Sequence, residues 1–199
     1  MMIYKDYKFN PDKCGGTMTE EEYIKMIDIL EDFSPNRICE LGSGQSTLVF
    51  EQFCKFHGKR MFSIEHDEAY KRENTVMLPM VEYTEINVDG SIYGDCNKYD
   101  GFEDWLKKQD KFDFVLVDGP VGCAFREMYK YSRVQILSFV ILDKLSDKSI
   151  VLYHDSERGN AKTTLEEFER LLLEKGFKFK KELINENNTR ELTIYNIEK

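Results

Sequence analysis

The sequence predicts an α/β fold built on one mostly parallel, seven-stranded sheet that ends in an antiparallel hairpin. Three observations support this. Beyond residue 36, short apolar runs alternate with amphipathic segments of helical length. A glycine-rich turn, Gly42 to Gly44, follows the first run. The last two runs are separated only by Asn185 to Thr189, which is too short for a helical crossover and suits a hairpin.

The N-terminal part is expected to hold an extension and one helix (residues 1–36), followed by the α/β core (residues 37–199). Thr19 and Glu22 have the spacing of a capping box, which marks the start of that helix. The 199 residues suffice for one sizeable core and are few for two. We therefore expect a single domain over residues 1–199.

The remaining elements follow from the apolar runs. The expected strands are Arg37–Glu40, Arg60–Glu65, Val81–Val88, Phe112–Asp118, Ser149–His154, Phe177–Ile184 and Arg190–Ile197. The expected helices are Ser46–His57, Asp67–Leu78, Phe102–Gln109, Phe125–Leu142 and Ala161–Lys175. Because helical crossovers join parallel strands, the first five strands should run parallel. The segment Ser91 to Gly101, with Tyr93 and Tyr99, is expected to be a loop that contacts a substrate.

Composition narrows the class of partner. The net charge of -9 and pI near 5.0 argue against a nucleic-acid partner, which needs a basic surface. No apolar run approaches the length of a membrane span, and the first ten residues lack the apolar stretch of a signal peptide. The five cysteines are scattered and odd in number, as is typical of reduced thiols. We expect a cytoplasmic protein bound to neither membrane nor nucleic acid, and the sequence predicts no oligomeric state.

The glycine turn is the first candidate site. The run Glu40-Leu41-Gly42-Ser43-Gly44-Gln45-Ser46 lies at the carboxyl end of a strand, where glycines let the backbone approach a ligand. A tight turn without a ligand explains the glycines alone equally well. The second strand, however, ends in Glu65, about 20 residues further on, where a carboxylate can accept both hydroxyl hydrogens of a ribose.

These residues resemble the first motif of the class I S-adenosylmethionine-dependent methyltransferases, an acidic residue followed by Gly-x-Gly-x-Gly. Glu40, Gly42 and Gly44 match, and Ser46 replaces the third glycine. The resemblance implies the Rossmann-like sandwich of that family, with S-adenosylmethionine as cofactor, its methionine part near Glu40 and its ribose on Glu65. The implied cofactor-binding residues are Glu40, Gly42, Ser43, Gly44, Ser46, Glu65, His66, Asp89 and Asp118.

Asp89 is included because the family often places an adenine contact after the third strand. An Asp-Gly turn explains Asp89 and Gly90 equally well.

Two further strands end in polar residues, Asp118 after one and His154-Asp155 after the next. Ending a buried strand in a carboxylate costs desolvation energy, so two such ends side by side indicate a site. Alternatively, the aspartates cap the turns that follow. Together with Arg133 and Arg158, these ends resemble small methyltransferases that include the glucuronoxylan O-methyltransferase type. This implies methyl transfer to a hydroxyl, with a small-molecule or glycan acceptor as partner.

Asp118, His154 and Asp155 are the candidate catalytic residues. A hydroxyl must lose its proton as it takes the methyl group, and we expect Asp118 to be the base, with His154 as the alternative. A divalent metal held by Asp118, His154 and Asp155 would serve as well, since oxygen and imidazole ligands suit several ions. The sequence leaves both open and assigns no metal ligand. Arg133 and Arg158 are candidates for clamping an acidic substrate.

Two functions compete with methyl transfer. An NAD-dependent oxidoreductase shares the glycine turn and the acidic strand end, but its Gly-x-Gly-x-x-Gly fingerprint requires glycine where this chain has Thr47. A catalytically silent S-adenosylmethionine-binding protein would share every feature of the donor site, because a fold does not guarantee activity.

Overall fold

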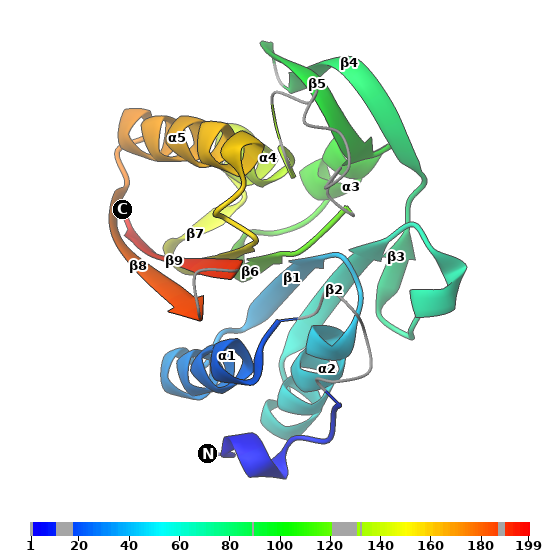
Figure 1. Cartoon of the computed structure of the whole chain (residues 1–199), viewed down its shortest axis with the longest axis vertical. Coiled ribbons are helices and arrows are strands. Elements are labelled where there is room, and N and C mark those ends of the chain that lie inside the picture. Colours follow the sequence, from blue (N-terminus) through cyan, green and yellow to red (C-terminus); the bar gives the residue numbers. More distant parts are fainter. Residues whose placement is uncertain (1, 11–17, 89, 121–130, 132, 187–189) are drawn as a thin grey trace.

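The computed structural model describes residues 2–10, 18–88, 90–120, 131, 133–186 and 190–199. Its centre is a seven-stranded sheet with the order β3-β2-β1-β6-β7-β9-β8 (Figure 1). These strands are β1 (Arg37–Leu41), β2 (Arg60–Glu65), β3 (Thr75–Met77), β6 (Phe112–Val117), β7 (Leu145–His154), β8 (Lys178–Glu186) and β9 (Arg190–Glu198). The first five of that order pair in parallel, and β9 is antiparallel to β7 and β8. The predicted fold class, a mostly parallel sheet with a final hairpin, is confirmed.

Helices cover both faces of this sheet (Figure 1). One face carries α1 (Glu20–Phe33) and α2 (Gln45–His57), and the other carries α3 (Phe102–Lys107), α4 (Ile136–Ile141) and α5 (Gly159–Glu174). Short 3-10 helices occupy Tyr4–Asp6 and Glu68–Tyr70. No helix in the ranges described above is long and apolar enough to cross a membrane.

Two apolar layers result from the alternation of side chains along the strands. Ile38 packs with the side chains of α1 and α2, whereas Cys39 and Leu41 pack with those of α3, α4 and α5. Phe114 and Val115 divide in the same way on β6. Helix α1 therefore belongs to the layer beneath the sheet, and its capping box is present: Thr19 N–H donates to the Glu22 carboxylate over 2.7 Å.

Three sequence predictions near the edge of the sheet were wrong. The strand at Val81–Val88 exists as β4 (Met80–Val88), but it pairs antiparallel with β5 (Ser91–Tyr99) in a separate two-stranded ribbon. The third strand of the main sheet is instead Thr75–Met77, within the segment predicted as a helix. A strand of three residues is too short to leave a periodic pattern. The segment expected to be a loop forms β5 because its alternating residues pair with β4.

The long helix predicted over Phe125–Leu142 is observed as α4 in its last part. Residues 125–130 and 132 lie outside the described residues.

The turns after β1 and β6 touch each other through bare backbone. Gly42 has a φ of +95°, and a Cβ built on it would lie 3.0 Å from the Gly119 nitrogen. A Cβ on Gly119 would lie 2.7 Å from the Gly42 Cα. Next to this contact, Asp118 N–H donates to the Leu41 carbonyl over 2.9 Å. The predicted cofactor turn and the predicted catalytic strand end are therefore in direct contact.

This contact predicts a stability difference between two glycines. Gly119→Ala forces a methyl group into the Gly42 backbone and should lower the free energy of unfolding by about 1–3 kcal/mol. Gly159→Ala, at the first residue of α5 with no described atom within 4 Å of the new carbon, should leave stability unchanged or slightly higher. Urea denaturation measures both. Equal stability of the two variants would show that the two turns are not in contact.

Candidate functional site

The glycine turn is shaped from inside the protein by Glu40. The Glu40 side chain is fully buried and accepts hydrogen bonds from the hydroxyls of Ser46 (2.5 Å), Thr47 (2.7 Å) and Ser63 (2.8 Å). Thr47 Oγ1 in turn accepts the Gly44 N–H over 2.8 Å. Glu40 and Ser46, both predicted as cofactor residues, thus lie beneath the turn and fix its shape.

Burial is the largest influence on the Glu40 carboxyl. It raises the pKa to about 7, although the three hydroxyl donors oppose the shift. The negative charge of Asp118 adds to the increase. Glu40 therefore changes its protonation state near neutral pH.

Glu65 ties the turn to the end of β2. One carboxylate oxygen, Oε2, accepts the Ser43 N–H over 2.8 Å. The other, Oε1, accepts the N–H groups of His66 (2.6 Å) and Asp67 (2.9 Å), and His66 Nδ1 lies 2.7 Å from it. The structure therefore brings together Ser43, Glu65 and His66, three of the residues predicted to bind the cofactor.

Gly44 and Gly42 differ in how closely the described residues approach them. A Cβ built on Gly44, at the start of α2, meets no described atom within 4 Å. Gly42, in contrast, is enclosed by residues 118 and 119. Asp89, the predicted adenine contact, lies outside the described residues.

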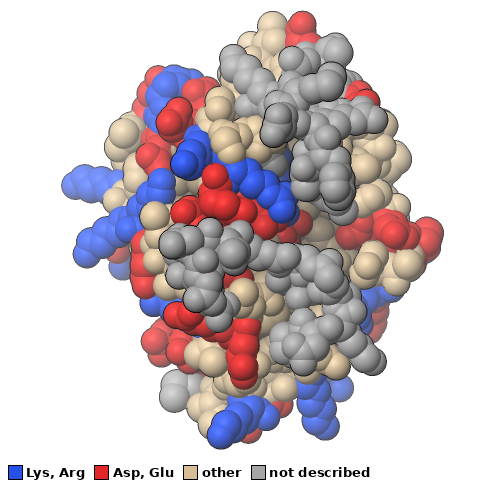
Figure 2. All heavy atoms as spheres, in the orientation of Figure 1, with Lys and Arg blue, Asp and Glu red and all other residues tan. Residues whose placement is uncertain are grey.

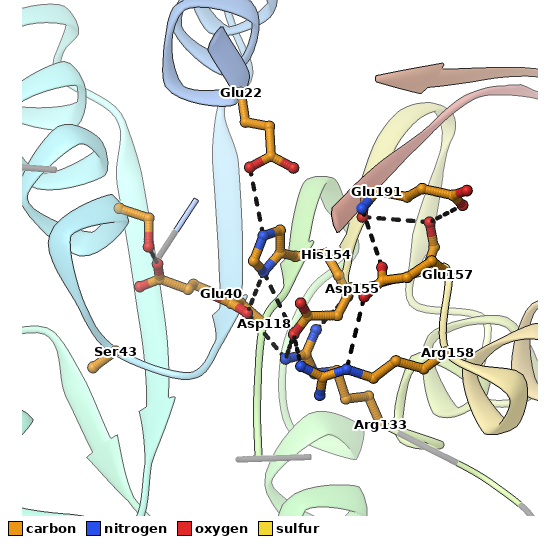
Figure 3. Close-up of polar contacts among 12 residues, drawn as sticks. Glu22, Glu40, Ser43, Asp118, Arg133, His154, Asp155, Glu157, Arg158 and Glu191 are labelled. Carbon is orange, nitrogen blue, oxygen red and sulfur yellow. Dashed lines mark hydrogen bonds and ion pairs between the residues drawn. The ribbon is translucent and has the colours of Figure 1, made fainter. Parts of the chain in front are cut away.

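The second candidate site is a charged cluster at the ends of β6 and β7 (Figure 3). Asp118 Oδ1 lies 2.9 Å from His154 Nδ1 and 3.1 Å from an Arg133 nitrogen. Asp155 Oδ2 lies 2.9 Å from Arg133 and 3.0 Å from Arg158. Arg133 also donates to the His154 carbonyl. In the same orientation as Figure 1, acidic and basic side chains lie side by side near the middle of the molecular surface (Figure 2).

His154 is held as a cation inside this cluster. Its side chain is fully buried, and burial alone lowers the pKa of an imidazole. The charge of Asp118 and the hydrogen bond to it outweigh burial and raise the pKa of His154 to about 10. Glu22 faces the other ring nitrogen at 3.5 Å, which is an ion-pair distance and too long for a good hydrogen bond.

Asp118 is the carboxylate of the cluster that solvent reaches. A quarter of its side chain is exposed, against 7% for Asp155. Burial raises its pKa, but the neighbouring charges of His154 and Arg133 outweigh this and leave the pKa below its usual value. Asp118 is therefore ionised and held in place by His154 and Arg133, and part of its side chain is exposed to solvent.

Two residues of the cluster adopt a backbone conformation that is uncommon outside glycine. Arg133 has a φ of +47° and Asp155 a φ of +59°. Such positions cost free energy and persist where surrounding contacts fix them, often at functional sites. Here an ion pair joins the two residues, and each has a further contact in the cluster: Arg133 with the His154 carbonyl and Asp155 with Arg158.

Sequence reasoning missed Glu22 as a member of the cluster. Its capping-box role already accounts for it, and no local pattern shows that α1 places its carboxylate against His154. Arg133 and Arg158 were expected to clamp a substrate, but the structure pairs both with Asp155. Arg158 keeps a third of its side chain exposed and stays within reach of a ligand.

The ligating atoms of Asp118, His154 and Asp155 lie within 4.8 Å of one another, close enough for one divalent ion. Both carboxylates, however, already pair with Arg133, and Asp118 also lies against His154. A divalent ion would have to displace these cations.

A separate hollow of about 940 Å³ lies between α2, the start of β2 and residues 71–74. It contains none of the predicted site residues. We place the candidate site at the strand ends and not in this hollow, because the ionised and hydrogen-bonded groups meet there.

The chain matches no protein-family model and no curated protein. It is similar to solved structures of methyltransferases. One is PaMTH1 of Podospora anserina bound to S-adenosylhomocysteine (16% identity, 92% of this chain and 81% of that one, TM-score 0.56). Another is an O-methyltransferase of Bacillus cereus with the same ligand (10% identity, 94% of this chain and 84% of that one, TM-score 0.59). A third is TomG of Streptomyces achromogenes with S-adenosylmethionine (11% identity, 92% of this chain and 82% of that one, TM-score 0.56). At these identities the similarity shows that the chain shares their fold.

The buried state of Glu40 predicts a pH-dependent stability. Its pKa is about 7 in the folded state against an ordinary 4.5, so the folded protein gains stability from the bound proton below pH 4.5 and loses it as pH rises through 7. Glu40→Gln mimics the protonated form and should exceed the wild type in unfolding free energy by a margin that grows by about 2–3 kcal/mol from pH 5 to pH 8.

Urea denaturation at four pH values measures this margin. Glu68→Gln, a change at an exposed carboxylate, is the matched control and should show a nearly constant difference. A margin that stays flat for Glu40→Gln as well would mean that Glu40 is ionised throughout.

Proposed function

We propose that the protein is an S-adenosylmethionine-dependent methyltransferase that methylates a hydroxyl group of a small molecule or sugar. The observation that carries the proposal is the contact between the two turns, which places an open glycine turn with Glu65 directly beside the ionised, partly exposed Asp118. The O-methyltransferase neighbours bound to S-adenosylmethionine or S-adenosylhomocysteine support it. The proposed location is the cytoplasm, and the proposed partner is a small-molecule or glycan acceptor.

The residues present fit this donor. No described atom lies within 4 Å of a Cβ built on Gly44, and the Glu65 carboxylate is fixed by backbone N–H groups, with Oε2 accepting from Ser43 alone among the described residues. A carboxylate so held suits the hydroxyls of a ribose. When bound, the donor supplies a methyl group that leaves its sulfur for the acceptor oxygen. Gly42, Ser43 and His66 complete the proposed donor site.

Asp118 is the proposed proton acceptor. A quarter of its side chain is exposed and its turn contacts the glycine turn, so we propose that an acceptor hydroxyl bound there donates to it. A carboxylate of low pKa is sufficient, because the hydroxyl proton becomes strongly acidic as the oxygen forms its bond to the methyl carbon. His154 is unsuited to this step because it already carries a proton. We assign His154 and Arg133 to holding Asp118 ionised and in place, and Asp155 to holding Arg133.

The NAD-dependent alternative is disfavoured by one observation. Thr47 is fully buried and its hydroxyl links Glu40 to Gly44, at the position where a dinucleotide fingerprint needs glycine. A catalytically silent protein would bind the donor and leave every hydroxyl unmethylated.

Donor binding is tested by calorimetric titration. S-adenosylhomocysteine should bind the wild type and NAD should not. Glu65→Ala should weaken S-adenosylhomocysteine binding by about 1–3 kcal/mol, because charge-assisted hydrogen bonds to the ribose are lost. Glu68→Ala, an exposed change three residues away, is the control and should bind normally. Binding of NAD alone would overturn the proposal, and unchanged affinity in Glu65→Ala would remove Glu65 from the site.

Catalysis is tested by Asp118→Asn. The amide keeps the shape of the side chain but cannot take a proton, so turnover should fall by about 10²-fold while S-adenosylhomocysteine affinity changes little. The assay is release of S-adenosylhomocysteine in the presence of sugar and phenol acceptors, with Glu157→Gln as the nearby control. Turnover that EDTA abolishes and one divalent ion restores would show a metal mechanism instead. Wild-type turnover in Asp118→Asn would remove the proposed base.

A further inference from the structure

A buried phenol without a hydrogen-bond partner lies beside the proposed site. Tyr99, the last residue of β5, is fully buried, and its hydroxyl has no hydrogen-bond partner among the residues that the structure describes. Burying a hydroxyl without a partner costs free energy that phenylalanine would avoid. Such a group therefore calls for a physical explanation.

The main chain at Tyr99 is fixed in place. The Gln135 side chain, itself buried, accepts the Tyr99 N–H over 2.7 Å and donates to the Tyr99 carbonyl over 2.9 Å. Glu103 lies 3.1 Å from the same Gln135 nitrogen and holds the amide in its orientation. One side chain thus satisfies both backbone groups of Tyr99 as a neighbouring strand would. These contacts fix the main chain that carries the phenol. A poorly held β4–β5 ribbon therefore does not explain why the Tyr99 hydroxyl is unpaired.

The hydroxyl lies where the two turns meet. A Cβ built on Gly119 would lie only 2.4 Å from the Tyr99 hydroxyl oxygen, so the phenol reaches the contact between Gly42 and Gly119. The Tyr99 ring centroid is 6.1 Å from that of His66, next to Glu65. Burial and the nearby charge of Glu65 hold the pKa of Tyr99 well above its usual value, so the hydroxyl keeps its proton and can donate.

We propose that the Tyr99 hydroxyl donates a hydrogen bond to an oxygen of the S-adenosyl ligand bound at the glycine turn. This inference rests on the proposed function and adds a positioning residue from the β4–β5 ribbon to the donor site. The ligand supplies the partner that the phenol lacks within the protein, and Gln135 provides the rigidity that makes the contact selective. The β4–β5 ribbon then contributes a residue to the donor site.

Tyr99→Phe tests the proposal because it removes one oxygen and keeps the ring. Affinity for S-adenosylhomocysteine, measured by calorimetry, should fall about tenfold. The melting temperature of the ligand-free protein should stay the same or rise, because a buried unpaired hydroxyl is removed. A purely structural tyrosine would leave the affinity unchanged.

Tyr195→Phe is the matched control. Tyr195 is equally buried, but its hydroxyl donates to Glu169 over 2.7 Å on the far side of α5. This variant should lose thermal stability and keep its S-adenosylhomocysteine affinity, the reverse of the pattern expected for Tyr99→Phe. Titration with 5′-methylthioadenosine, which lacks the amino-acid part, locates the contact: a loss with both ligands assigns it to the adenosyl part, and a loss with S-adenosylhomocysteine alone assigns it to the amino-acid part.

The outcomes separate the two proposals. Wild-type protein that fails to bind S-adenosylhomocysteine overturns the proposed function and this inference with it. Wild-type binding together with equal affinity in Tyr99→Phe overturns the inference and leaves the proposed function standing.

Discussion

The backbone contact between Gly42 and Gly119 is the constraint on which the site depends. Neighbouring parallel strands already bring the ends of β1 and β6 to one edge of the sheet, but ordinary side chains would keep the turns that follow them apart. With hydrogen atoms in place of side chains, the two turns meet at van der Waals distance. A group held by the glycine turn is thereby placed within a side chain's length of Asp118, with no mobile loop needed to bring the two together.

Two buried acids beside this contact are stabilised in opposite ways, and their roles follow from the difference. Glu40 accepts hydrogen bonds from neutral hydroxyl groups, which supply no positive charge. Burial therefore raises its pKa to about 7, and its hydrogen bonds shape the turn. Asp118 faces His154 and Arg133, whose charges keep it ionised. The charged carboxylate is the one that solvent reaches. This difference supports the proposed role of Asp118 as the proton acceptor, whereas Glu40 lies beneath the turn.

The sequence predicts those parts of the molecule that local patterns encode. The sheet, the hairpin, the glycine turn and the strand ends at Glu65, Asp118 and His154 follow from periodicity and from polar residues that end apolar runs. The short strand Thr75–Met77 leaves no such pattern, and the partner of β4 cannot be read from alternation alone. Glu22 reaches His154, and Gln135 reaches Tyr99, only through the packing of distant elements. Interactions of this kind set the electrostatics of the site, and local sequence patterns do not predict them.

The contacts that sequence reasoning missed also complete the site from outside the sheet. Helix α1 presents Glu22 to the back of His154, and the β4–β5 ribbon presents Tyr99 to the contact between the turns. Strand ends alone supply a glycine turn and carboxylates, which many α/β proteins share. In this structure α1 and the β4–β5 ribbon add to these strand ends a carboxylate beside His154 and a phenol beside the two turns. The groups gathered at this edge of the sheet therefore come from elements on both of its faces as well as from the strands themselves.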